Sequence, residues 1–400
     1  MRKINYGGMI LGQEEKDAIN RIVEKNWWPA GEECIMMERE AADYLGIKHC
    51  VLANSGSSAG LLGLASLELP KGSEVIIPAT TFPTIFNIIL QLGLKPVVCD
   101  SKIGSYTLDV DEVRKLIRRK TRAIIAVHPV GNPVDMPRLM KLVEGRGIYV
   151  LEDNCDGWGG SIVRQTLDRN ELTGELRTVS QKLGTFGHLS FTSFHAAHIC
   201  SMGQGGGVFT NDDEIARRVM MYRDWGRQSD IPRRTNDGKW EDLPADYDMR
   251  FIYEKVGWNL GPLELQCAMG REQLKKVEDI KAKRKANYEY FIERLEGYPG
   301  LIMPDVVEGA DPSWFALPLT YTGDRGKLVE HLEERGIETR SMFAGNILKH
   351  PAYKGLKVRK GNLSHADYIL EHSFWIGVHP TLTEEEREYV VQAFDDFFNE

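Results

Sequence analysis

Residues 192–211 read TSFHAAHICSMGQGGGVFTN, in which two apolar runs flank a polar turn and a glycine-rich return. The apolar runs predict two strands, and the residues between them predict a loop. Glycine has no Cβ atom, so the return can approach a ligand or a neighbouring strand closely. We therefore expect this loop to present the Ser193 hydroxyl and the His198 imidazole at the mouth of a sheet.

The first half of the chain alternates between strand and helix patterns. Apolar runs at 74–78, 95–99, 123–127 and from residue 148 onward predict strands, and the segments between them predict helices. Strands that alternate with helices at this spacing indicate a parallel sheet whose two faces are covered. The expected fold class is therefore α/β.

Two segments lie where a sheet of this kind binds ligands. The strand that starts near residue 148 ends in Asp153, with Asp156 shortly after it, and open α/β sheets bind ligands at the carboxyl edge of their strands. The segment Ser55-Gly56-Ser57-Ser58 follows a strand and leads into a helical run, and the free N–H groups of a helix start attract a phosphate. An ordinary helix cap is the alternative interpretation of that segment.

The composition argues against several classes of protein. The chain has 400 residues, 42% of them hydrophobic and 27% charged, which suits a globular protein of two domains. Its formal charge of −8 argues against nucleic acid or an anionic membrane as a partner. No apolar run approaches the roughly 20 residues of a membrane span, and the first residues lack the apolar core of a signal peptide. We therefore expect a cytoplasmic protein.

The stretch around His198 resembles the active-site loop of the DegT/DnrJ/EryC1/StrS family of fold-type I, pyridoxal-phosphate-dependent sugar aminotransferases. The pattern of that family is S-F-x-x-x-K-x-x-x-x-G-E-G-G, and its Lys forms the covalent link to the cofactor. In this chain His198 stands in place of the Lys, and Gln204 stands in place of the Glu. An imidazole cannot form that link, but it can take up and return protons near neutral pH. The same His occurs in the nucleotide-sugar 3-dehydratase branch of the family, which uses the amine form of the cofactor.

The resemblance implies a site for pyridoxal 5′-phosphate or pyridoxamine 5′-phosphate. Asp153 would pair with the ring nitrogen of the cofactor, and Phe82 would stack on the ring. Asp156 would either face the ring hydroxyl or orient His198, which is expected to be catalytic together with Asp153. Four residues would hold the phosphate through N–H groups or a hydroxyl: Gly56, Ser57, Ser58 and Ser193.

The resemblance also singles out four candidates for binding the substrate: Trp28, His128, Arg340 and Asn346. His128 opens the sequence HPVGNPVDM, and Arg340 and Asn346 lie within TRSMFAGN, and both patterns resemble the 3-dehydratase branch. A guanidinium suits the bidentate binding of a carboxylate or phosphate, so Arg340 is a candidate anion ligand. A packed surface tryptophan and a surface arginine are the alternative interpretations of Trp28 and Arg340.

The sequence GWNLGPLELQ at 257–266 resembles the family pattern G-Y-N-x-K/R-x-x-x-x-Q. In that family the Asn crosses a homodimer interface to the cofactor phosphate of the partner, and we expect the same of Asn259. Gly261 stands where a basic residue is common, so one cationic contact to the phosphate is missing.

The fold that the resemblance implies is the aspartate-aminotransferase type. A large α/β domain with a mostly parallel sheet, residues 1–262, would bind the cofactor, and a smaller C-terminal α/β domain would follow at 263–400. One long helix from about 263 to 295 is expected to connect them. The polar segment 162–189 is expected to be an exposed insertion.

The activity that the resemblance implies is that of a lyase. It would remove the C3 hydroxyl from a nucleotide-linked 4-keto-6-deoxyhexose, and L-glutamate would restore the amine form of the cofactor. Two alternatives remain open. One is an aminotransferase-like enzyme without the Schiff-base lysine, and the other is a catalytically inactive binding protein.

The cysteines bear on a further alternative, a class of sugar 3-dehydrases that carries an iron–sulfur cluster. Three cluster ligands of that class follow an Arg-Asp-Trp-Gly segment, but after Arg223-Asp224-Trp225-Gly226 the next cysteine here is Cys267. The six cysteines form no C-x-x-C pair, so neither a metal site nor a disulfide framework is expected. Arg223 and Arg227 are expected to be cations at the negative end of a helix dipole.

Overall fold

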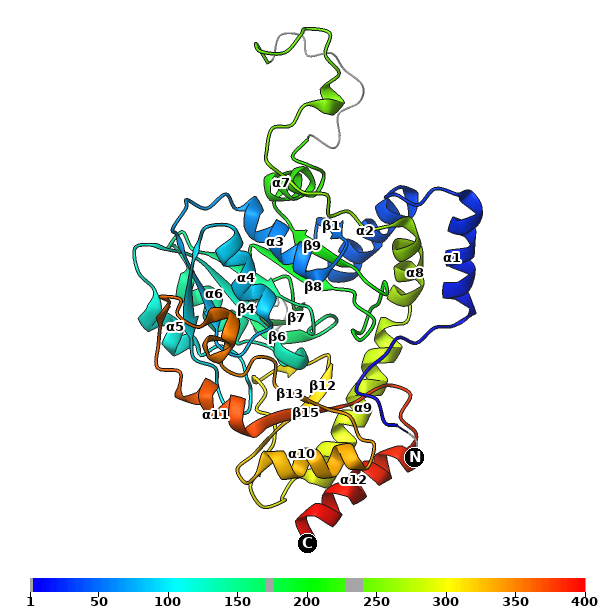
Figure 1. Ribbon diagram of the computed structural model, residues 1–400, viewed down its shortest axis with the longest axis vertical. Helices are drawn as coiled ribbons and strands as arrows, with labels where there is room; N and C mark the ends of the chain where they lie inside the picture. The colour runs from blue at the N-terminus through cyan, green and yellow to red at the C-terminus, as the bar shows by residue number, and fades with distance from the viewer. Residues whose placement is uncertain (1–2, 170–175, 228–239, 400) are drawn as a thin grey trace.

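The computed structural model describes residues 3–169, 176–227 and 240–399 (Figure 1). Its main element is an eight-stranded sheet in the order β1-β9-β8-β5-β4-β2-β3-β14. Neighbouring strands are parallel except around β9, which pairs antiparallel with β1 and β8, so the expected mostly parallel sheet is confirmed. The strands are β1 (His49–Ala53), β2 (Glu74–Pro78), β3 (Lys95–Cys99), β4 (Thr121–Val127), β5 (Tyr149–Asp153), β8 (Leu189–Ser193), β9 (Gly206–Thr210) and β14 (Arg359–Lys360).

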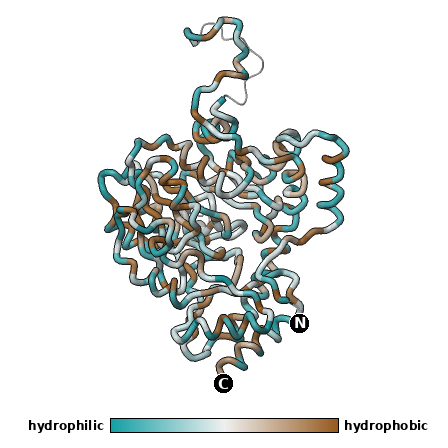
Figure 2. The backbone as a smooth tube through the Cα atoms, in the orientation of Figure 1, coloured by the Kyte–Doolittle hydropathy of each residue, from teal (hydrophilic) through white to brown (hydrophobic). Residues whose placement is uncertain are grey.

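Helices cover both faces of the large sheet. Val75 and Ile77 of β2 pack in one hydrophobic cluster, and Ile76 packs in another on the opposite face. Successive side chains of a strand point to opposite faces, so a strand that is covered on both is apolar throughout. The first face carries α3 (Gly56–Ser66), α4 (Pro83–Gln91) and α7 (Asp213–Arg223), and the second carries α5 (Val110–Leu116) and α6 (Met136–Val143). Figure 2 shows hydrophobic residues gathered in this body of the molecule.

A smaller antiparallel sheet, in the order β10-β12-β15-β13, lies in the C-terminal part of the chain. Its strands are β10 (Leu301–Ile302), β12 (Ala316–Tyr321), β13 (Thr339–Ser341) and β15 (Ser373–Gly377). The helices around it are α9 (Val277–Leu295), α10 (Arg325–Glu334), α11 (Ser364–His372) and α12 (Glu384–Asn399). Short 3-10 turns are η1 (Pro129–Gly131), η2 (Met249–Phe251), η3 (Ile347–Lys349) and η4 (Pro351–Tyr353).

Several backbone contacts tie the C-terminal part of the chain to the large sheet. β14 pairs with β3, where Arg359 lies opposite Val97. The Ala344 N–H donates to the Thr81 carbonyl over 3.3 Å, and the Ile347 N–H donates to the Ala79 carbonyl over 3.1 Å. The domain boundary between residues 262 and 263 stays a prediction.

One expectation about a single element needs correction. The helix expected from 263 to 295 is two helices, α8 (Glu264–Leu274) and α9, because the chain changes direction at Lys275 and Lys276, where neither Gly nor Pro marks the break. The segment 162–189, expected to be an exposed insertion, contains β6 (Ser161–Arg169) and β7 (Leu176–Lys182), which pair with each other, and its residues 170–175 lie outside the described chain. Val163 and Val179 in it are exposed, and β6 also pairs with β11 (Ala310–Asp311).

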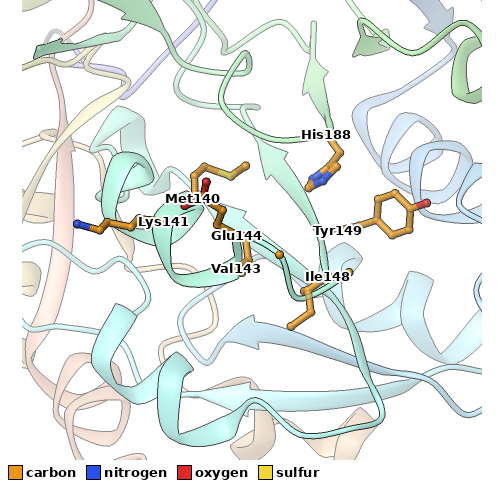
Figure 3. Close-up of a pocket in the computed structure, with 9 residues that line it drawn as sticks. Met140, Lys141, Val143, Glu144, Ile148, Tyr149 and His188 are labelled. Atoms are coloured by element: carbon orange, nitrogen blue, oxygen red, sulfur yellow. The ribbon is translucent and has the colours of Figure 1, made fainter. Parts of the chain in front are cut away.

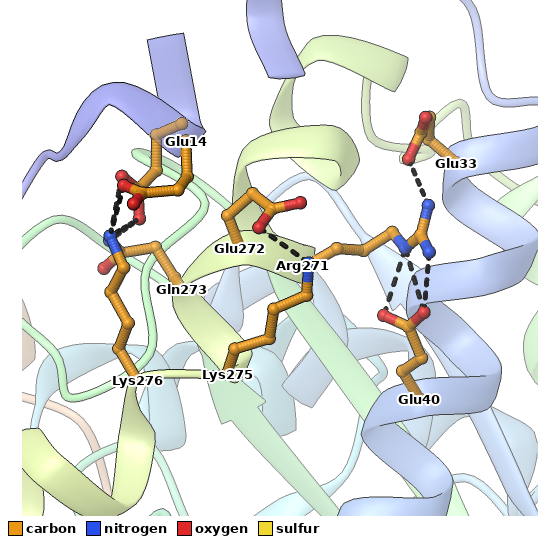
Figure 4. Close-up of polar contacts among 9 residues, drawn as sticks. Glu14, Glu33, Glu40, Arg271, Glu272, Gln273, Lys275 and Lys276 are labelled. Carbon is orange, nitrogen blue, oxygen red and sulfur yellow. Dashed lines mark hydrogen bonds and ion pairs between the residues drawn. The ribbon is translucent and has the colours of Figure 1, made fainter. Parts of the chain in front are cut away.

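Charged side chains fix α8 between α1 (Gln13–Lys25) and α2 (Glu32–Leu45), and we call this arrangement the α8 clamp (Figure 4). Arg271 donates to Glu33 and Glu40, each over 2.7 Å. Lys276 and Gln273 donate to the fully buried Glu15, each over 2.7 Å. Burial raises the pKa of Glu15, but the hydrogen bonds from Lys276 and its neighbours outweigh burial, so the pKa lies below its usual value.

The sequence led us to expect that Arg223 only complements a helix dipole. In the structure it also forms hydrogen bonds with other elements. Its side chain is only 11% exposed, and it donates to Glu38 over 2.9 Å and to the Leu52 carbonyl over 3.2 Å. Arg223 therefore fixes the end of α7 to α2 and β1. Arg227 lies over the Trp225 ring, with its guanidinium carbon 4.9 Å from the ring centroid.

Candidate active site

A cavity of about 750 Å³ lies at the carboxyl ends of β5 and β8. Asp153 ends β5 and Ser193 ends β8, so the strand order brings the two segments together as the sequence predicted. The predicted site residues that line this cavity are Gly56, Ser57, Phe82, His128, Asp153, Asp156, Ser193, His198 and Arg340.

A second hollow, of about 700 Å³, lies at the opposite end of β5 (Figure 3). It is lined by Tyr149, where β5 begins, by His188 just before β8, and by residues of α6 such as Lys141. None of the predicted site residues lines it. The candidate active site is therefore the cavity at the carboxyl ends.

The loop between β8 and β9 places His198 in the cavity. Backbone bonds from Phe194 to Gly205 and from Met202 to Phe194 close the loop, over 2.9 and 2.8 Å. The His198 Nε2 atom lies 3.2 Å from Asp156 Oδ1, and both side chains are largely buried. The Nδ1 atom of His198 is buried and has no hydrogen-bond partner among the described residues. An imidazole with one nitrogen held by a carboxylate and the other unengaged can act as a general base.

Asp156 is itself held in place by a strained turn. Its Oδ2 atom accepts a hydrogen bond from the Val130 N–H over 2.9 Å. Val130 is fully buried and has φ of 48°, a conformation that β-branched residues rarely adopt. Such strain is found where the surrounding structure fixes a functional geometry. The structure places Asp156 beside His198, as one of its two predicted roles requires, and the choice between the roles stays a prediction.

The predicted phosphate cradle lies at the start of α3, beside the cavity. The helix begins at Gly56, so the N–H groups of Gly56 and Ser57 have no partner within the helix. A Cβ atom on Gly56 would lie 2.6 Å from the Ser193 Cβ atom, so only glycine lets β8 approach so closely. The Ser57 hydroxyl lies at the cavity, 2.7 Å from the Thr84 hydroxyl.

Asp153 and Phe82 line another part of the cavity. Asp153 is 6% exposed, and its carboxylate accepts a hydrogen bond from the Cys155 N–H over 3.1 Å. Burial raises the pKa of Asp153 to about 6, because desolvation of the carboxylate outweighs the hydrogen bonds from Cys155. Phe82 is the residue just before α4, which begins at Pro83, and it is 58% exposed although it is aromatic. A buried carboxylate and an accessible ring therefore share one cavity.

Two predicted residues, Ser58 and Asn346, are engaged by the protein itself. The Ser58 hydroxyl donates to Asn54 over 2.7 Å inside the helix cap, so it does not face the cavity. The side chain of Asn346 is buried and does not line the cavity, since it donates to Asp367 over 2.6 Å and accepts from the Leu348 N–H. Neither side chain lines the cavity, because local capping takes up both polar groups, and their contact with a ligand stays a prediction.

His128 borders the cavity without offering it a nitrogen. Its Nδ1 atom accepts from the Val134 N–H, and its Nε2 atom donates to Glu152, each over 3.2 Å. Glu152 also accepts from the N–H groups of the segment 184–187. His128 can therefore contribute the face of its ring and not a hydrogen bond.

Trp28 and Asn259 lie outside the cavity, on the surface of the chain. Trp28 is 47% exposed, and its carbonyl accepts from the Glu264 N–H over 2.9 Å. Asn259 is exposed and forms an isolated bridge with Asp224. Within one chain neither residue reaches the cavity.

Aromatic residues that the sequence did not single out form part of the cavity wall. Tyr6 and Trp375 meet edge to face with ring centroids 5.3 Å apart, and Phe315 meets Trp375 at 5.6 Å. Arg340 lies over the Tyr6 ring, 4.3 Å from its centroid. No local pattern marks these residues, because their contacts join opposite ends of the chain.

Searches of known proteins agree with this geometry. The pattern of the DegT/DnrJ/EryC1/StrS aminotransferase family matches residues 9–395. The chain is 34% identical over 414 residues to dTDP-4-dehydro-2,6-dideoxy-D-glucose 3-dehydratase of Saccharopolyspora spinosa, covering 98% of this chain and 86% of that protein. It is 32% identical over 383 residues to GDP-4-keto-6-deoxy-D-mannose 3-dehydratase of Yersinia pseudotuberculosis, covering 92% of each.

In the described parts of the chain no helix has both the length and the apolar character to cross a membrane.

Solved structures of 3-dehydratases resemble this chain as well. A GDP-4-keto-6-deoxymannose-3-dehydratase with a trapped PLP-glutamate geminal diamine superposes with a TM-score of 0.85 at 27% identity, covering 98% of this chain and 99% of that one. A variant of such an enzyme with bound GDP-perosamine has a TM-score of 0.85 at 28% identity, covering 98% and 100%. The expected fold-type I architecture is confirmed, and the chain belongs to the DegT/DnrJ/EryC1/StrS aminotransferase family.

Proposed function

We propose that this chain is a pyridoxamine-phosphate-dependent 3-dehydratase that removes the C3 hydroxyl of a nucleotide-linked 4-keto-6-deoxyhexose. The observation that carries the proposal is the placement of His198, which stands at the position of the family's lysine and lies 3.2 Å from Asp156 in the cavity. A lysine would recapture the aldehyde form of the cofactor and favour amine transfer. An imidazole leaves the cofactor unattached and can move protons.

The residues around the cavity fit the cofactor. The free N–H groups of Gly56 and Ser57, with the Ser193 hydroxyl, suit its phosphate. The accessible ring of Phe82 can stack on the pyridine ring, a contact worth about 0.5–1.5 kcal/mol beyond the area it buries. Asp153 offers a buried carboxylate to a protonated ring nitrogen, and that pairing would offset the desolvation of Asp153.

The proposed chemistry needs a proton carrier next to the cofactor. When bound, the amine form of the cofactor supplies the nitrogen that condenses with the C4 ketone and a ring that takes up electrons. The Asp153 carboxylate would keep the ring nitrogen protonated. Asp156 would hold the imidazole of His198 through Nε2, and that imidazole would take up the proton released at C4′ and return it to the departing C3 hydroxyl, which leaves as water.

L-Glutamate is the proposed amino donor, and Arg340 is the proposed ligand for its carboxylate or for a substrate phosphate. Arg340 lines the cavity, and its exposed guanidinium lies 3.6 Å from Glu338. A guanidinium binds carboxylate and phosphate through parallel hydrogen bonds. The reaction balances, because glutamate supplies the two electrons and becomes 2-oxoglutarate and ammonia while the sugar loses one oxygen atom.

A homodimer with shared sites is part of the proposal. Trp28 and Asn259 are exposed on the surface of one chain, as residues must be if they are to reach the cavity of another. Large apolar side chains near them are exposed as well, and exposed apolar patches are typical of interfaces. These are Trp27 (62% exposed), Trp225 (46%), Val256 (93%) and Leu263 (46%).

The test is to incubate the protein with pyridoxamine phosphate, L-glutamate and a panel of nucleotide-linked 4-keto-6-deoxyhexoses, and to identify the products by mass spectrometry. The expected product is lighter than its substrate by one oxygen atom, and it forms together with ammonia and 2-oxoglutarate. An amino sugar without free ammonia would identify an aminotransferase. Cofactor binding without turnover of any keto sugar would identify a binding protein.

A second test replaces His198 with the residue typical of the family. His198→Lys should attach the aldehyde form of the cofactor covalently, which borohydride reduction and mass measurement of the protein would reveal. The native chain should show no such mass increase. An increase in the native chain would contradict the assignment of this site.

A further inference from the structure

Arg284 is a buried cation directly behind the loop that carries His198. It lies on α9 and is 1% exposed. Its Nη1 atom donates to the Phe315 carbonyl over 2.6 Å, and its Nη2 atom donates to the Ala197 carbonyl over 3.1 Å. Ala197 precedes His198, so one hydrogen bond of Arg284 acts directly on the backbone next to the imidazole.

The second hydrogen bond of Arg284 leads to Asp156 through two backbone contacts. The Phe315 N–H donates to the Val130 carbonyl, and the Val130 N–H donates to Asp156 Oδ2, each over 2.9 Å. The other oxygen of Asp156 faces His198 Nε2. Arg284 thus closes a circuit of hydrogen bonds that begins at Ala197 and ends at His198.

The circuit fixes the imidazole from three sides. The Phe315 ring packs on the His198 ring, with centroids 5.4 Å apart, while the Phe315 carbonyl is held by Arg284. The positive φ of Val130 directs its N–H to Asp156 and its carbonyl to Phe315. A shift of Arg284 would therefore move both partners of the His198–Asp156 contact.

The partners of Arg284 are two backbone carbonyls and the Phe315 ring, whose centroid lies 5.6 Å from the guanidinium carbon. No carboxylate pairs with it among the described residues, and its Nε atom is buried without a hydrogen bond. Burial lowers the pKa of Arg284 to about 10, against the opposing effect of the negative charge on Asp156. A buried cation without a carboxylate lowers stability, so a role in stability alone does not explain it.

We infer that Arg284 is a positioning residue for the proposed dehydration, in which it holds the Ala197 and Phe315 carbonyls so that His198 and Asp156 keep their contact. The inference rests on the proposed function, because His198 is the proton carrier there. A displacement of about 1 Å at a reacting group can lower a rate about 100-fold. Arg284 does not line the cavity, so it should affect turnover and not substrate binding.

The experiment compares Arg284→Met, which keeps the apolar stem, and Arg284→Lys, which keeps the charge, with the native enzyme. Arg284→Met should lower kcat about 10- to 100-fold with little change in KM, and Arg284→Lys should recover part of the loss. Because Arg284→Met removes a buried charge that has no carboxylate partner, its urea midpoint should not fall below the native value. Lys285→Met is the matched control, because it removes a neighbouring cation of α9 that pairs with Asp311 at the surface.

A readout without turnover separates this inference from the proposed function. Nitrogen NMR of histidine-labelled protein, with the His198 signals assigned by His198→Asn, should show the proton on Nε2 in the native chain and a mixture of tautomers in Arg284→Met. If the native chain dehydrates no sugar but the tautomer still shifts, the proposed function fails and the positioning role stands. An unchanged kcat and tautomer in Arg284→Met would overturn the inference. The inference would also be overturned if kcat, KM and stability all changed to a similar extent and Arg284→Lys did not restore them.

Discussion

Two buried carboxylates, Asp153 at the candidate site and Glu15 in the α8 clamp, show that the two regions treat charge differently. Their side chains are 6% and 0% exposed. Burial raises the pKa of Glu15, but the bonds from Lys276 and Gln273 outweigh it and bring the pKa below its usual value. Burial raises the pKa of Asp153 to about 6, and no described lysine or arginine pairs with it.

The cations of the two regions differ in the same way. Arg271 of the clamp donates to Glu33 and Glu40, whereas Arg284 behind the site donates to carbonyl groups. In the clamp, both members of each ion pair are side chains of this protein, and their pairing stabilises the fold. The site keeps single charges buried, and a protein tolerates that loss of stability where binding or catalysis uses the charge.

His198→Asn should have the largest effect, and it tests the candidate active site. Proton transfer by a positioned side chain contributes about 10²–10⁴-fold to a rate, so kcat for water loss should fall by that factor while the urea midpoint stays unchanged. Product formation with glutamate, followed by mass spectrometry, measures it. His195→Asn removes the imidazole three residues earlier and should lower kcat far less. Equal losses in the two variants would contradict the role of His198.

Asp153→Asn should stabilise the cofactor-free protein while it abolishes turnover. The pKa of Asp153 is raised from 3.8 to about 6, so the folded state loses stability as the pH rises through that window. Above about pH 6 the folded state is less stable by about 3 kcal/mol for this reason. The variant has no carboxylate at this position, so it should not show that loss of stability. Urea unfolding near pH 8 and near pH 4 measures the difference, which should vanish at the lower pH. A variant less stable than the native chain near pH 8 would contradict this prediction.

Lys276→Met should show the opposite dependence on pH in the clamp. It leaves the Glu15 carboxylate buried with fewer partners and should lower stability by about 1.5–3 kcal/mol near neutral pH. The pKa of Glu15 lies below its usual 4.5, so its stabilising effect is present above that value and is lost as the pH falls further. The loss in the variant should therefore shrink below about pH 4.5, as urea unfolding would show.

Lys275→Met is the control for this prediction. Lys275 is the preceding residue and pairs with Glu272 at the surface, where its side chain is 63% exposed (Figure 4). Its removal should change stability by less than about 1 kcal/mol. An equal loss in the two variants would show that the burial of Glu15 is not what distinguishes the clamp.

The sequence was sufficient to predict what depends on neighbouring residues. The strand, loop and strand around His198, the helix start at Gly56 and the carboxylate at the end of β5 all follow from local pattern and strand order. The pattern did not reveal that Ser58 and Asn346 are engaged by the protein, because a short polar side chain near a helix start can bond to its own segment.

Residues whose position depends on distant contacts could not be predicted. Arg284 lies within the helix predicted from about 263 to 295, and only the packing of α9 against residues 197 and 315 shows that it is buried. The break at Lys275 was missed for a similar reason, because the clamp fixes the direction of α8 through α1 and α2. Propensity carries no signal of either contact.

The pairing of β14 with β3 limits how the cavity can move. Arg340 and Ala344 lie on the wall from the C-terminal part of the chain, and that wall is tied to the large sheet at Thr81, Ala79 and Val97. A hinge needs a few residues that can rotate freely between two bodies, and three cross-links restrict such rotation. Sugar entry and product release should therefore proceed through rotations of side chains at the rim, with the two walls moving as one body.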